Sequence, residues 1–339
     1  MVTTHEHETL ARARDLYAQA DQDRLEYWAS RARNEVHWET PFTEVLDWSN
    51  PPFARWFADG TTNACYNAVD RHVEAGNGDR VALYFEGEPG DDEAVTYADL
   101  QARVSQAANA LEALGVTKGD RVAIYLPMLV EAVVSILACA RIGAVHSVVF
   151  GGFSAEALRS RIDDAQAKVV ITADGSYRRG KPNMLKPIVD DALTEPGHSV
   201  EHVLVVRRNN GDIDWVEGRD RWFHDVLEAQ PATHEVAWVE AEHPLFILYT
   251  SGTTGTPKGI LHTTGGYLTQ VTATARDTFD LLPESDVYWC TADVGWVTGH
   301  SYIVYGPMSN GVTQVLYEGT PDTPHRGRWW EIVEKYGVT

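Results

Sequence analysis

Residues 245–259 have the sequence LFILYTSGTTGTPKG, the segment most informative about the fold. An apolar run typical of a buried strand leads into a loop with three glycines, five hydroxyl side chains and one lysine, Lys258. Glycines let the backbone point N–H groups at an anion, hydroxyls add neutral hydrogen bonds, and lysine adds positive charge. A flexible Gly/Thr turn is the alternative, but the preceding strand and the density of donors favour a polyphosphate-binding loop.

The side chains and backbone groups expected to hold the phosphates belong to a short consecutive set: Thr250, Ser251, Gly252, Thr253, Thr254, Gly255 and Lys258. The loop is not a Walker P-loop, because that motif places Ser or Thr directly after its Gly-Lys pair to hold Mg²⁺. Lys258 instead lies between Pro257 and Gly259. A kinase or a transport NTPase of the Walker type is therefore disfavoured.

On both sides of this loop, apolar strand-like segments alternate with helix-length segments. The expected strands are 81–85, 122–126, 144–150, 169–171, 203–206, 245–249, 287–290 and 315–317. Thr96, followed by Asp99, predicts the start of one helix, and Ser154 predicts the start of another. Continuously apolar strands between helices predict an α/β fold with mostly parallel sheets and helices on both faces.

The first 95 residues differ from the remainder in composition. Residues 11–33 are rich in Ala, Arg, Leu and Glu and predict a helix, whereas the following aromatic stretch contains several prolines that exclude one. So many large aromatics indicate a buried strap. We expect residues 1–95 to form a cap or extension, ending at an acidic turn at 91–93, and residues 96–339 to form the main domain.

The end of the chain predicts a helix with apolar residues on much of its surface, stopped by Gly337 and followed by the start of a strand. We therefore expect the fold to be truncated, with a C-terminal domain absent from this chain.

The composition indicates which partners and which cellular compartment are to be expected. The formal net charge of −21 disfavours nucleic acid and anionic membranes as partners. The three cysteines form no CxxC pair and the N-terminus has no signal-peptide pattern, so we expect a cytoplasmic protein with reduced thiols. No apolar run is long enough to cross a bilayer.

The loop from Tyr249 to Gly259 resembles the signature of the adenylate-forming enzyme family without a break. Further segments resemble acetyl-CoA synthetases: VLDWSNPPF at 45–53, CYNAVDRH at 65–72, VVFGGFS at 148–154 and TADVGWVTGHSY at 291–302. This resemblance implies the N-terminal portion of the acyl-CoA synthetase-like fold.

The same resemblance implies an AMP-forming ligase that joins acetate, ATP and CoA to give acetyl-CoA, AMP and pyrophosphate through an acetyl-adenylate. It further implies Mg²⁺ as cofactor, small-molecule substrates as partners, and regulation of the intact enzyme by lysine acyltransferases and deacylases. Lys258 would be the catalytic cation at the β- and γ-phosphates, and no metal ligand is expected within this chain.

The resemblance also assigns CoA contacts to a basic turn and two isolated positions: Arg178, Arg179, Gly180, Lys181, Thr298 and Asp322. Relatives often have a second arginine where this chain has Lys181, which binds as a point charge and not as a fork. Many relatives place Asn at the position of Asp322, whose ionised carboxylate cannot donate a hydrogen bond. An ordinary solvated basic loop is the alternative for the turn.

The resemblance assigns Trp296, Val297 and Thr298 to the wall of the acyl pocket, with Trp296 as plain core being the alternative. Propionate or another short-chain acid remains an alternative substrate, because one methylene changes discrimination only about 10- to 200-fold. A non-catalytic nucleotide-binding fragment is the alternative of another class, since this chain lacks the family's C-terminal lysine. His262 and His300 have no visible nucleophile partner, so we expect structural roles for them.

Overall fold

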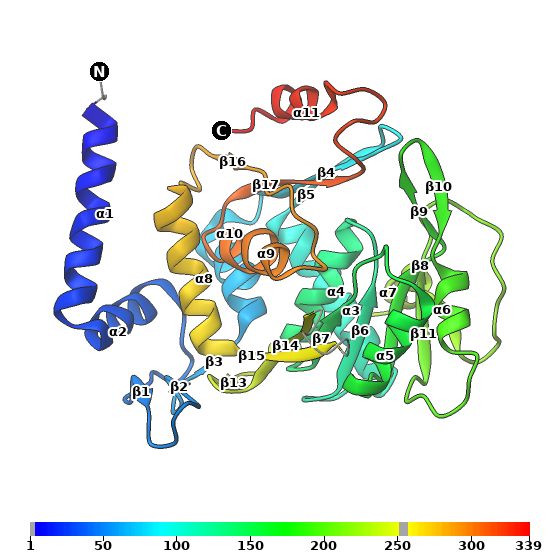
Figure 1. Ribbon diagram of the computed structural model, residues 1–339, viewed down its shortest axis with the longest axis horizontal. Coiled ribbons are helices and arrows are strands. Elements are labelled where there is room, and N and C mark those ends of the chain that lie inside the picture. Colours follow the sequence, from blue (N-terminus) through cyan, green and yellow to red (C-terminus); the bar gives the residue numbers. More distant parts are fainter. Residues whose placement is uncertain (1–3, 251–256) are drawn as a thin grey trace.

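The computed structural model describes residues 4–250 and 257–339. Its larger sheet has seven strands in the order β12-β11-β8-β6-β7-β14-β15, and all neighbours are parallel except the last pair (Figure 1). The strands are β6 (Arg121–Tyr125), β7 (Val145–Val148), β8 (Val169–Ala173), β11 (His202–Val206), β12 (Asp220–Trp222), β14 (Pro244–Thr250) and β15 (Lys258–Thr263). The predicted mostly parallel sheet is confirmed, and its apolar strands are buried as that arrangement requires.

A second sheet has four strands in the order β16-β17-β4-β5. They are β4 (Val81–Gly87), β5 (Asp92–Thr96), β16 (Val287–Tyr288) and β17 (Thr313–Glu318). The acidic residues predicted as a solvated turn lie partly in strand β5, since Asp92 and Glu93 pair with β4 and only the preceding residues turn. Exposed acidic side chains on an edge strand produce the same local sequence pattern as a turn.

Helices cover both faces of the seven-stranded sheet. Helices α3 (Tyr97–Ala113), α4 (Val130–Arg141) and α7 (Phe223–Glu228) pack together, while α5 (Ala155–Ala165) packs on α6 (Lys186–Ala192). The order in which right-handed crossovers connect the strands places these two groups on opposite faces. Thr96 and Asp99 form a reciprocal capping box at the start of α3, and Ser154 caps α5, as predicted.

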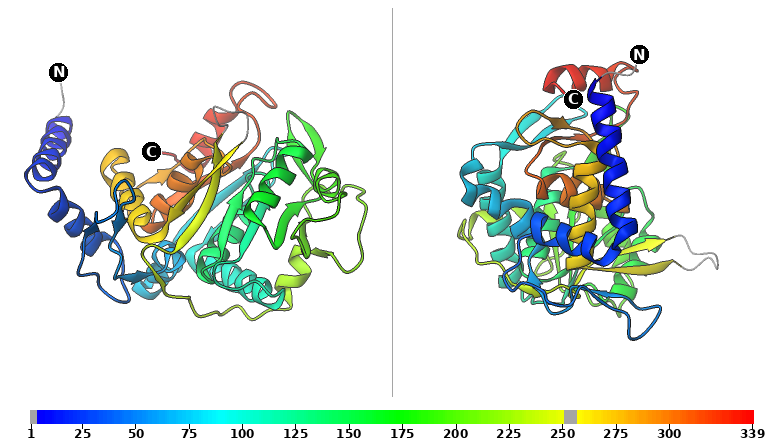
Figure 2. Two further views of the ribbon diagram at one scale, coloured as in Figure 1. Left: turned by 60° about the horizontal axis from the view of Figure 1, so that its bottom comes forward. Right: turned by 90° about the vertical axis from the view of Figure 1, so that its left-hand side faces the viewer.

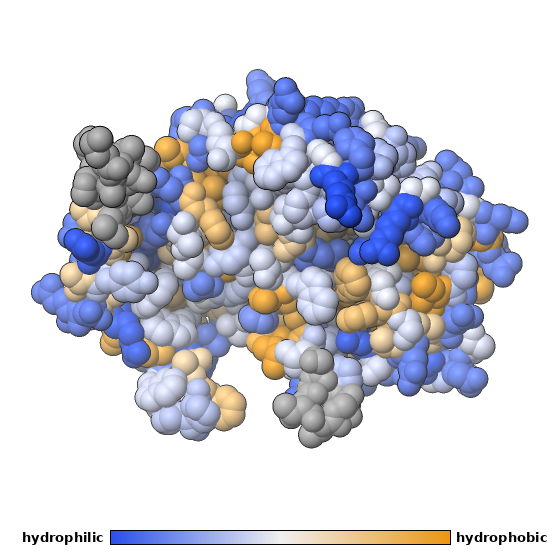
Figure 3. Space-filling model, turned by 45° about the horizontal axis from the view of Figure 1, so that its top comes forward, coloured by the Kyte–Doolittle hydropathy of each residue, from blue (hydrophilic) through white to orange (hydrophobic). Residues whose placement is uncertain are grey.

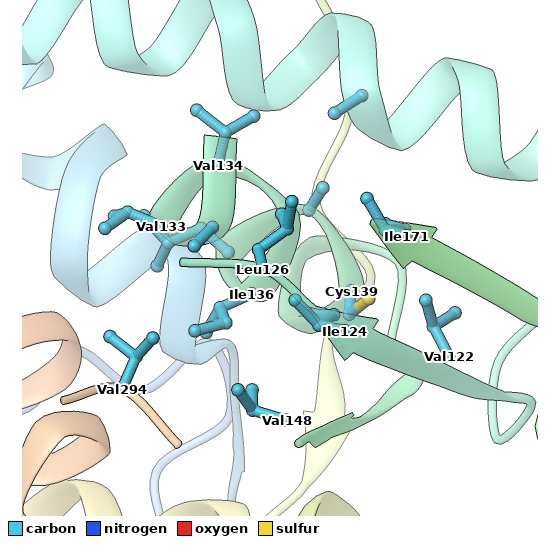
Figure 4. Packing of buried hydrophobic residues seen from close by; sticks show 14 of the residues in the cluster. Val122, Ile124, Leu126, Val133, Val134, Ile136, Cys139, Val148, Ile171 and Val294 are labelled. Carbon is cyan, nitrogen blue, oxygen red and sulfur yellow. The ribbon is translucent and has the colours of Figure 1, made fainter. Parts of the chain in front are cut away.

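The main core lies where α4 packs on the sheet. Figure 4 shows Ile136 and Cys139 of α4 beside Ile124 of β6, with Val133 farther along the same helix. All four side chains are fully buried. Burial raises the pKa of the Cys139 thiol, which makes it an inert packing group, as expected for a structural cysteine.

The helix predicted over residues 11–33 is two helices, α1 (Thr4–Gln22) and α2 (Arg24–Glu35). The chain breaks at Asp23, whose extended backbone and carboxylate cap α2 through the Glu26 N–H at 3.0 Å. Figure 2 shows α1 at the edge of the molecule, where Arg12 pairs with Asp277 of α8 (Thr264–Phe279) at 3.0 Å, and α2 also packs against α8.

The aromatic stretch contains no helix, as predicted, and folds into short antiparallel pairs. Strand β1 (Leu46–Asp47) pairs with β2 (Arg55–Trp56), and β3 (Thr61–Thr62) pairs with β13 (Val239–Glu240). Two π-helical segments follow, Tyr66–Asp70 and Val73–Asn77. Buried Asn63 anchors the stretch to the main domain by donating to the carbonyls of Ala140 at 2.9 Å and Ala237 at 2.8 Å. The boundary at residue 95 stays a prediction.

The remaining elements complete the described part of the chain. They are the hairpin β9 (Gly175–Arg178) and β10 (Lys181–Met184), helix α9 (Val297–Gly299), the π-helical segment His300–Tyr305, helix α10 (Gly306–Ser309) and helix α11 (Arg328–Tyr336). Gly337 ends α11 in the left-handed conformation at φ 64°, as predicted. None of the helices in residues 4–250 and 257–339 is long and apolar enough to cross a membrane. Figure 3 shows a largely hydrophilic face with small hydrophobic patches.

Candidate active site

The predicted phosphate loop connects the last two strands of the large sheet. Thr250 ends β14, Lys258 begins β15, and the two residues are direct antiparallel partners. Both are exposed, so the lysine is presented to solvent at the end of the hairpin where the loop connects the two strands. The other predicted phosphate-binding residues, Ser251, Gly252, Thr253, Thr254 and Gly255, lie outside the described residues.

Strand β14, which precedes the loop, contacts helix α5 through Asp164 and Arg161, two residues that were not predicted from the sequence to belong to the site. The Tyr249 hydroxyl donates to Asp164 at 2.7 Å, and burial together with this carboxylate raises the pKa of Tyr249. Arg161 lies between two rings, 4.7 Å from the Phe153 centroid and 5.4 Å from the Tyr249 centroid. This cation–π pair joins the 150–153 turn to the end of β14.

Two adjoining cavities of about 540 and 300 Å³ lie beside the carboxyl ends of β6, β8 and β17. Their shared lining comes from segments far apart in the sequence: Met128, Phe150, Arg178, Asp293 and Gly319. Ligands of parallel α/β folds characteristically bind at this edge, and both volumes suit parts of a small molecule. Arg178 is thus the one residue of the predicted basic turn that borders the cleft.

Asp293 and Glu318 are the acidic residues that line this cleft, and Asp293 borders both cavities. Burial raises the pKa of Asp293, and the Gly295 N–H, which donates to its Oδ1 at 2.7 Å, and the nearby Arg178 partly offset the rise.

The other members of the basic turn form the tip of the β9–β10 hairpin. Arg178 and Lys181 are direct cross-strand partners, and Arg179 and Gly180 make the two-residue connection between them. Asp322 is exposed in the loop before α11, and an added Cβ at Gly180 would lie 3.8 Å from Thr323. The structure therefore brings the basic turn and the segment of Asp322 together, although they are far apart in sequence.

Trp296, Val297 and Thr298 lie at and within the short helix α9, and all three are exposed. Trp296 is half exposed and packs on Phe150 and Phe153 at ring-centroid distances of 5.9 and 6.3 Å, so it is not plain core. Val297 borders a third cavity of about 520 Å³, together with His262, Tyr267 and Ser301. Thr298 is not among the residues that line these three cavities.

The conformation of α9 depends on a close backbone approach at Gly299. An added Cβ there would lie 2.2 Å from the carbonyl oxygen of Asp293, a distance that no side chain tolerates. A residue with a side chain at this position would push α9 away from the cleft.

His300 and His262 have structural surroundings, as expected. His300 is fully buried, its Nδ1 lies 3.1 Å from the Trp296 carbonyl oxygen, and burial lowers its pKa to about 4. His262 stacks on Phe246 at 4.4 Å, and burial lowers its pKa as well. Within the described residues, no group of three His, Cys, Asp or Glu side chains could hold a metal ion.

Comparison with known proteins agrees with the geometry. Residues 69–339 match the family of AMP-binding enzymes, and residues 13–68 match the acetyl-coenzyme A synthetase N-terminus. The chain is 68% identical over 325 residues to an acetyl-coenzyme A synthetase of Streptomyces avermitilis, which covers 96% of this chain and 50% of that protein.

Two further relatives give the same result. Identity is 63% over 327 residues to an acetyl-coenzyme A synthetase of Mycobacterium tuberculosis (96% of this chain, 50% of that protein). It is 54% over 327 residues to one of Cupriavidus pinatubonensis (96% of this chain, 49% of that protein). The chain therefore spans about half the length of these curated relatives.

Proposed function

The chain belongs to the AMP-binding enzyme family, and from this premise we propose that the protein containing it is an AMP-forming acetate–CoA ligase. Acetate attacks the α-phosphate of ATP to give acetyl-adenylate and pyrophosphate, and the CoA thiol then displaces AMP to give acetyl-CoA. The observation that supports the proposal is the hairpin of β14 and β15, in which Thr250 and Lys258 are paired and exposed at the two ends of the predicted phosphate loop.

The chemistry explains why a cation is required at this place. A carboxylate must approach a phosphate that is already anionic, and the leaving pyrophosphate accumulates charge. In the proposed site Lys258 neutralises the β- and γ-phosphates, and the backbone and hydroxyls of residues 250–255 are proposed as neutral donors. Mg²⁺, if bound by the phosphate oxygens of ATP, would supply further charge neutralisation.

The cleft beside Arg178 supports a CoA site in the same protein. Arg178, Arg179 and Lys181 supply three cations on one hairpin, against a formal net charge of −21 for the whole chain. Such a cluster favours the phosphate of the CoA nucleotide. Asp322, next to this hairpin in space, keeps its assignment as a second contact, and so does Thr298 of α9.

The acyl pocket is assigned to the α9 segment of Trp296, Val297 and Thr298. Large side chains in a pocket wall exclude longer acids, and on this ground acetate is proposed as the preferred substrate. The alternative is a ligase of propionate or another short-chain acid, and kcat/KM measured with acetate, propionate and butyrate distinguishes them.

The experiment that tests the proposed reaction is product analysis of the complete protein incubated with ATP, Mg²⁺, acetate and CoA. Acetyl-CoA, AMP and pyrophosphate are expected in equal amounts, each dependent on acetate. ADP and inorganic phosphate in place of AMP and pyrophosphate would instead indicate a phosphotransferase.

The alternative of another class is that these 339 residues alone bind the nucleotide without turnover. It is favoured by the length of the relatives, which are about twice as long as this chain. Calorimetric titration of the 339-residue chain with ATP, beside an assay for acetyl-CoA, tests it; acetyl-CoA formation by this chain would exclude it.

The setting of the proposed enzyme follows from the same premise. A cytoplasmic location suits its substrates and its free cysteines, and reversible lysine acylation of the complete enzyme is its proposed regulation. Residues 1–95 are proposed as the extension and residues 96–339 as part of the adenylation domain.

A further inference from the structure

We propose that Glu88 is a positioning residue for the CoA site: its carboxylate fixes the two-residue turn at Arg179 and Gly180 and couples that turn to the segment that follows β17. The proposal rests on the proposed CoA site and names a residue that shapes it without lining the cavities. Glu88 lies just after β4, about ninety residues before the turn.

The backbone of the turn is of a kind that needs external support. Both connecting residues have positive φ angles, 55° for Arg179 and 71° for Gly180. Two-residue hairpin turns with this geometry favour Asn-Gly or Gly-Gly, because other side chains crowd the backbone there. Arginine at the first position is therefore disfavoured unless something else stabilises the turn.

Glu88 provides that stabilisation. The Arg179 N–H donates to its Oε1 at 3.0 Å, and the Gly180 N–H donates to its Oε2 at 2.9 Å. One carboxylate thus binds two successive N–H groups of the turn. Its side chain is buried, with 7% of the residue exposed, so solvent cannot replace it without a rearrangement.

The same carboxylate reaches a third segment. The Thr320 N–H donates to Oε1 at 3.1 Å, and the Thr320 hydroxyl donates to it at 3.3 Å. The hydroxyls of Thr320 and Thr323 lie 3.0 Å apart. Glu88 therefore connects the tip of the basic hairpin to the loop that carries Asp322, the other assigned CoA contact on this side of the cleft.

The turn determines where the cations point. Arg178 and Lys181 are direct cross-strand partners, so their side chains lie on the same face of the hairpin. The base of the hairpin is held separately, since the Tyr177 N–H donates to Glu318 at 3.1 Å and Arg208 lies 4.9 Å from the Tyr177 ring centroid. Loss of the Glu88 contacts would release the tip while leaving the base in place.

The test compares Glu88→Gln with the wild type in the complete enzyme. The amide oxygen of Gln can still accept a hydrogen bond, but its NH₂ group faces donors and leaves at least one N–H of the turn unpaired. We expect the KM for CoA to rise about tenfold, while kcat and acetate-dependent exchange of pyrophosphate into ATP stay within about twofold.

A CoA analogue locates the effect. Dephospho-CoA lacks the nucleotide 3′-phosphate that the basic hairpin is proposed to meet, so its KM should be nearly the same in wild type and Glu88→Gln. The matched control is Asp59→Asn, because Asp59 also accepts backbone N–H groups, from Thr43 at 2.9 Å and Glu44 at 3.2 Å, but lies in the N-terminal region. It should change none of these values.

A second variant covers the case in which Glu88→Gln does not fold. Glu88→Asp keeps the carboxylate but shortens the side chain by one methylene, which withdraws it from the N–H groups of Arg179 and Gly180, so it should raise the KM for CoA alone. The inference is overturned if the CoA and exchange reactions fall together, if the KM for CoA is unchanged, or if dephospho-CoA is affected equally. A wild type that forms no acetyl-CoA would overturn the proposed function instead.

Discussion

Lys258 is the charged side chain that this chain contributes to the proposed adenylation. It begins β15 in an exposed position opposite Thr250, on a protein whose formal net charge of −21 would otherwise repel ATP. The hairpin holds this positive charge at the carboxyl end of strand β14, where it can attract the phosphates of ATP.

Replacing Lys258 with Ala in the complete enzyme should slow adenylation at least about tenfold. A hydrogen bond to a charged group contributes about 1.5–3 kcal/mol, and each 1.4 kcal/mol corresponds to a factor of ten. Acetate-dependent pyrophosphate exchange measures this step. The control is Lys118→Ala, which removes an exposed lysine from the loop before β6 and should leave the rate unchanged. An unchanged rate in Lys258→Ala would remove Lys258 from this role.

Some residues of the site could be predicted from the sequence and others could not. The phosphate loop and the basic turn are runs of characteristic residue types, so their chemistry is visible locally. Glu88 and Arg161 act through partners distant in the sequence, at Thr320 and Tyr249 respectively, and nothing in their neighbours indicates this. Only the folded chain reveals such contacts.

At the level of elements, helix starts and buried strands were predicted well because they depend on local signals. The capping box of α3 is an example, with the Asp99 N–H donating to the Thr96 hydroxyl at 3.1 Å. The helix predicted over residues 11–33 was wrong in one respect, because Asp23 ends one helix and begins the next. Ala-, Arg- and Leu-rich sequence on both sides hides such a break.

Thr96→Ala should lower the free energy of unfolding by about 1 kcal/mol, because the N-terminal N–H groups of α3 lose their acceptor. Urea unfolding followed by tryptophan fluorescence measures the change. Thr233→Ala, at an exposed threonine that caps no helix, should stay within about 0.5 kcal/mol of the wild type. Equal losses in the two variants would show that the capping box contributes nothing specific.

At the scale of the whole molecule, the sequence predicts the fold class but not the order of the strands in the two sheets. Alternating strands and helices indicate parallel sheets, but they do not show that β4 and β17, far apart in sequence, are neighbours in a second sheet. They also do not show that the two sheets meet at the cleft beside Arg178. Long-range strand order is decided by packing of whole faces, which local sequence does not contain.

The protein should lose stability as the pH falls from about 6.5 towards 4. Burial lowers the pKa of five histidines: His72, His146, His243, His262 and His300. In this window the unfolded chain binds protons at these residues and the folded protein does not, so acid favours unfolding. Glu35, Asp293 and Glu318, whose pKa values burial raises, oppose this trend.

His300→Asn tests the contribution of one of these histidines, because Asn keeps a donor near the Trp296 carbonyl and does not titrate. With a folded pKa of about 4, His300 accounts for about 2 kcal/mol of the stability lost between pH 7 and pH 5. The loss measured by urea unfolding should shrink by about that amount in the variant. An identical loss in both proteins would contradict the assignment.

In the proposed reaction, acetate is joined to the α-phosphorus of ATP held by the β14–β15 hairpin. The most direct measurement uses acetate labelled with ¹⁸O in its carboxylate, with ATP, Mg²⁺ and CoA, and mass spectrometry of the phosphate products. One ¹⁸O atom in each AMP is predicted, because the carboxylate oxygen stays on the α-phosphorus when CoA displaces AMP. Label in inorganic phosphate, or none in AMP, would contradict the account.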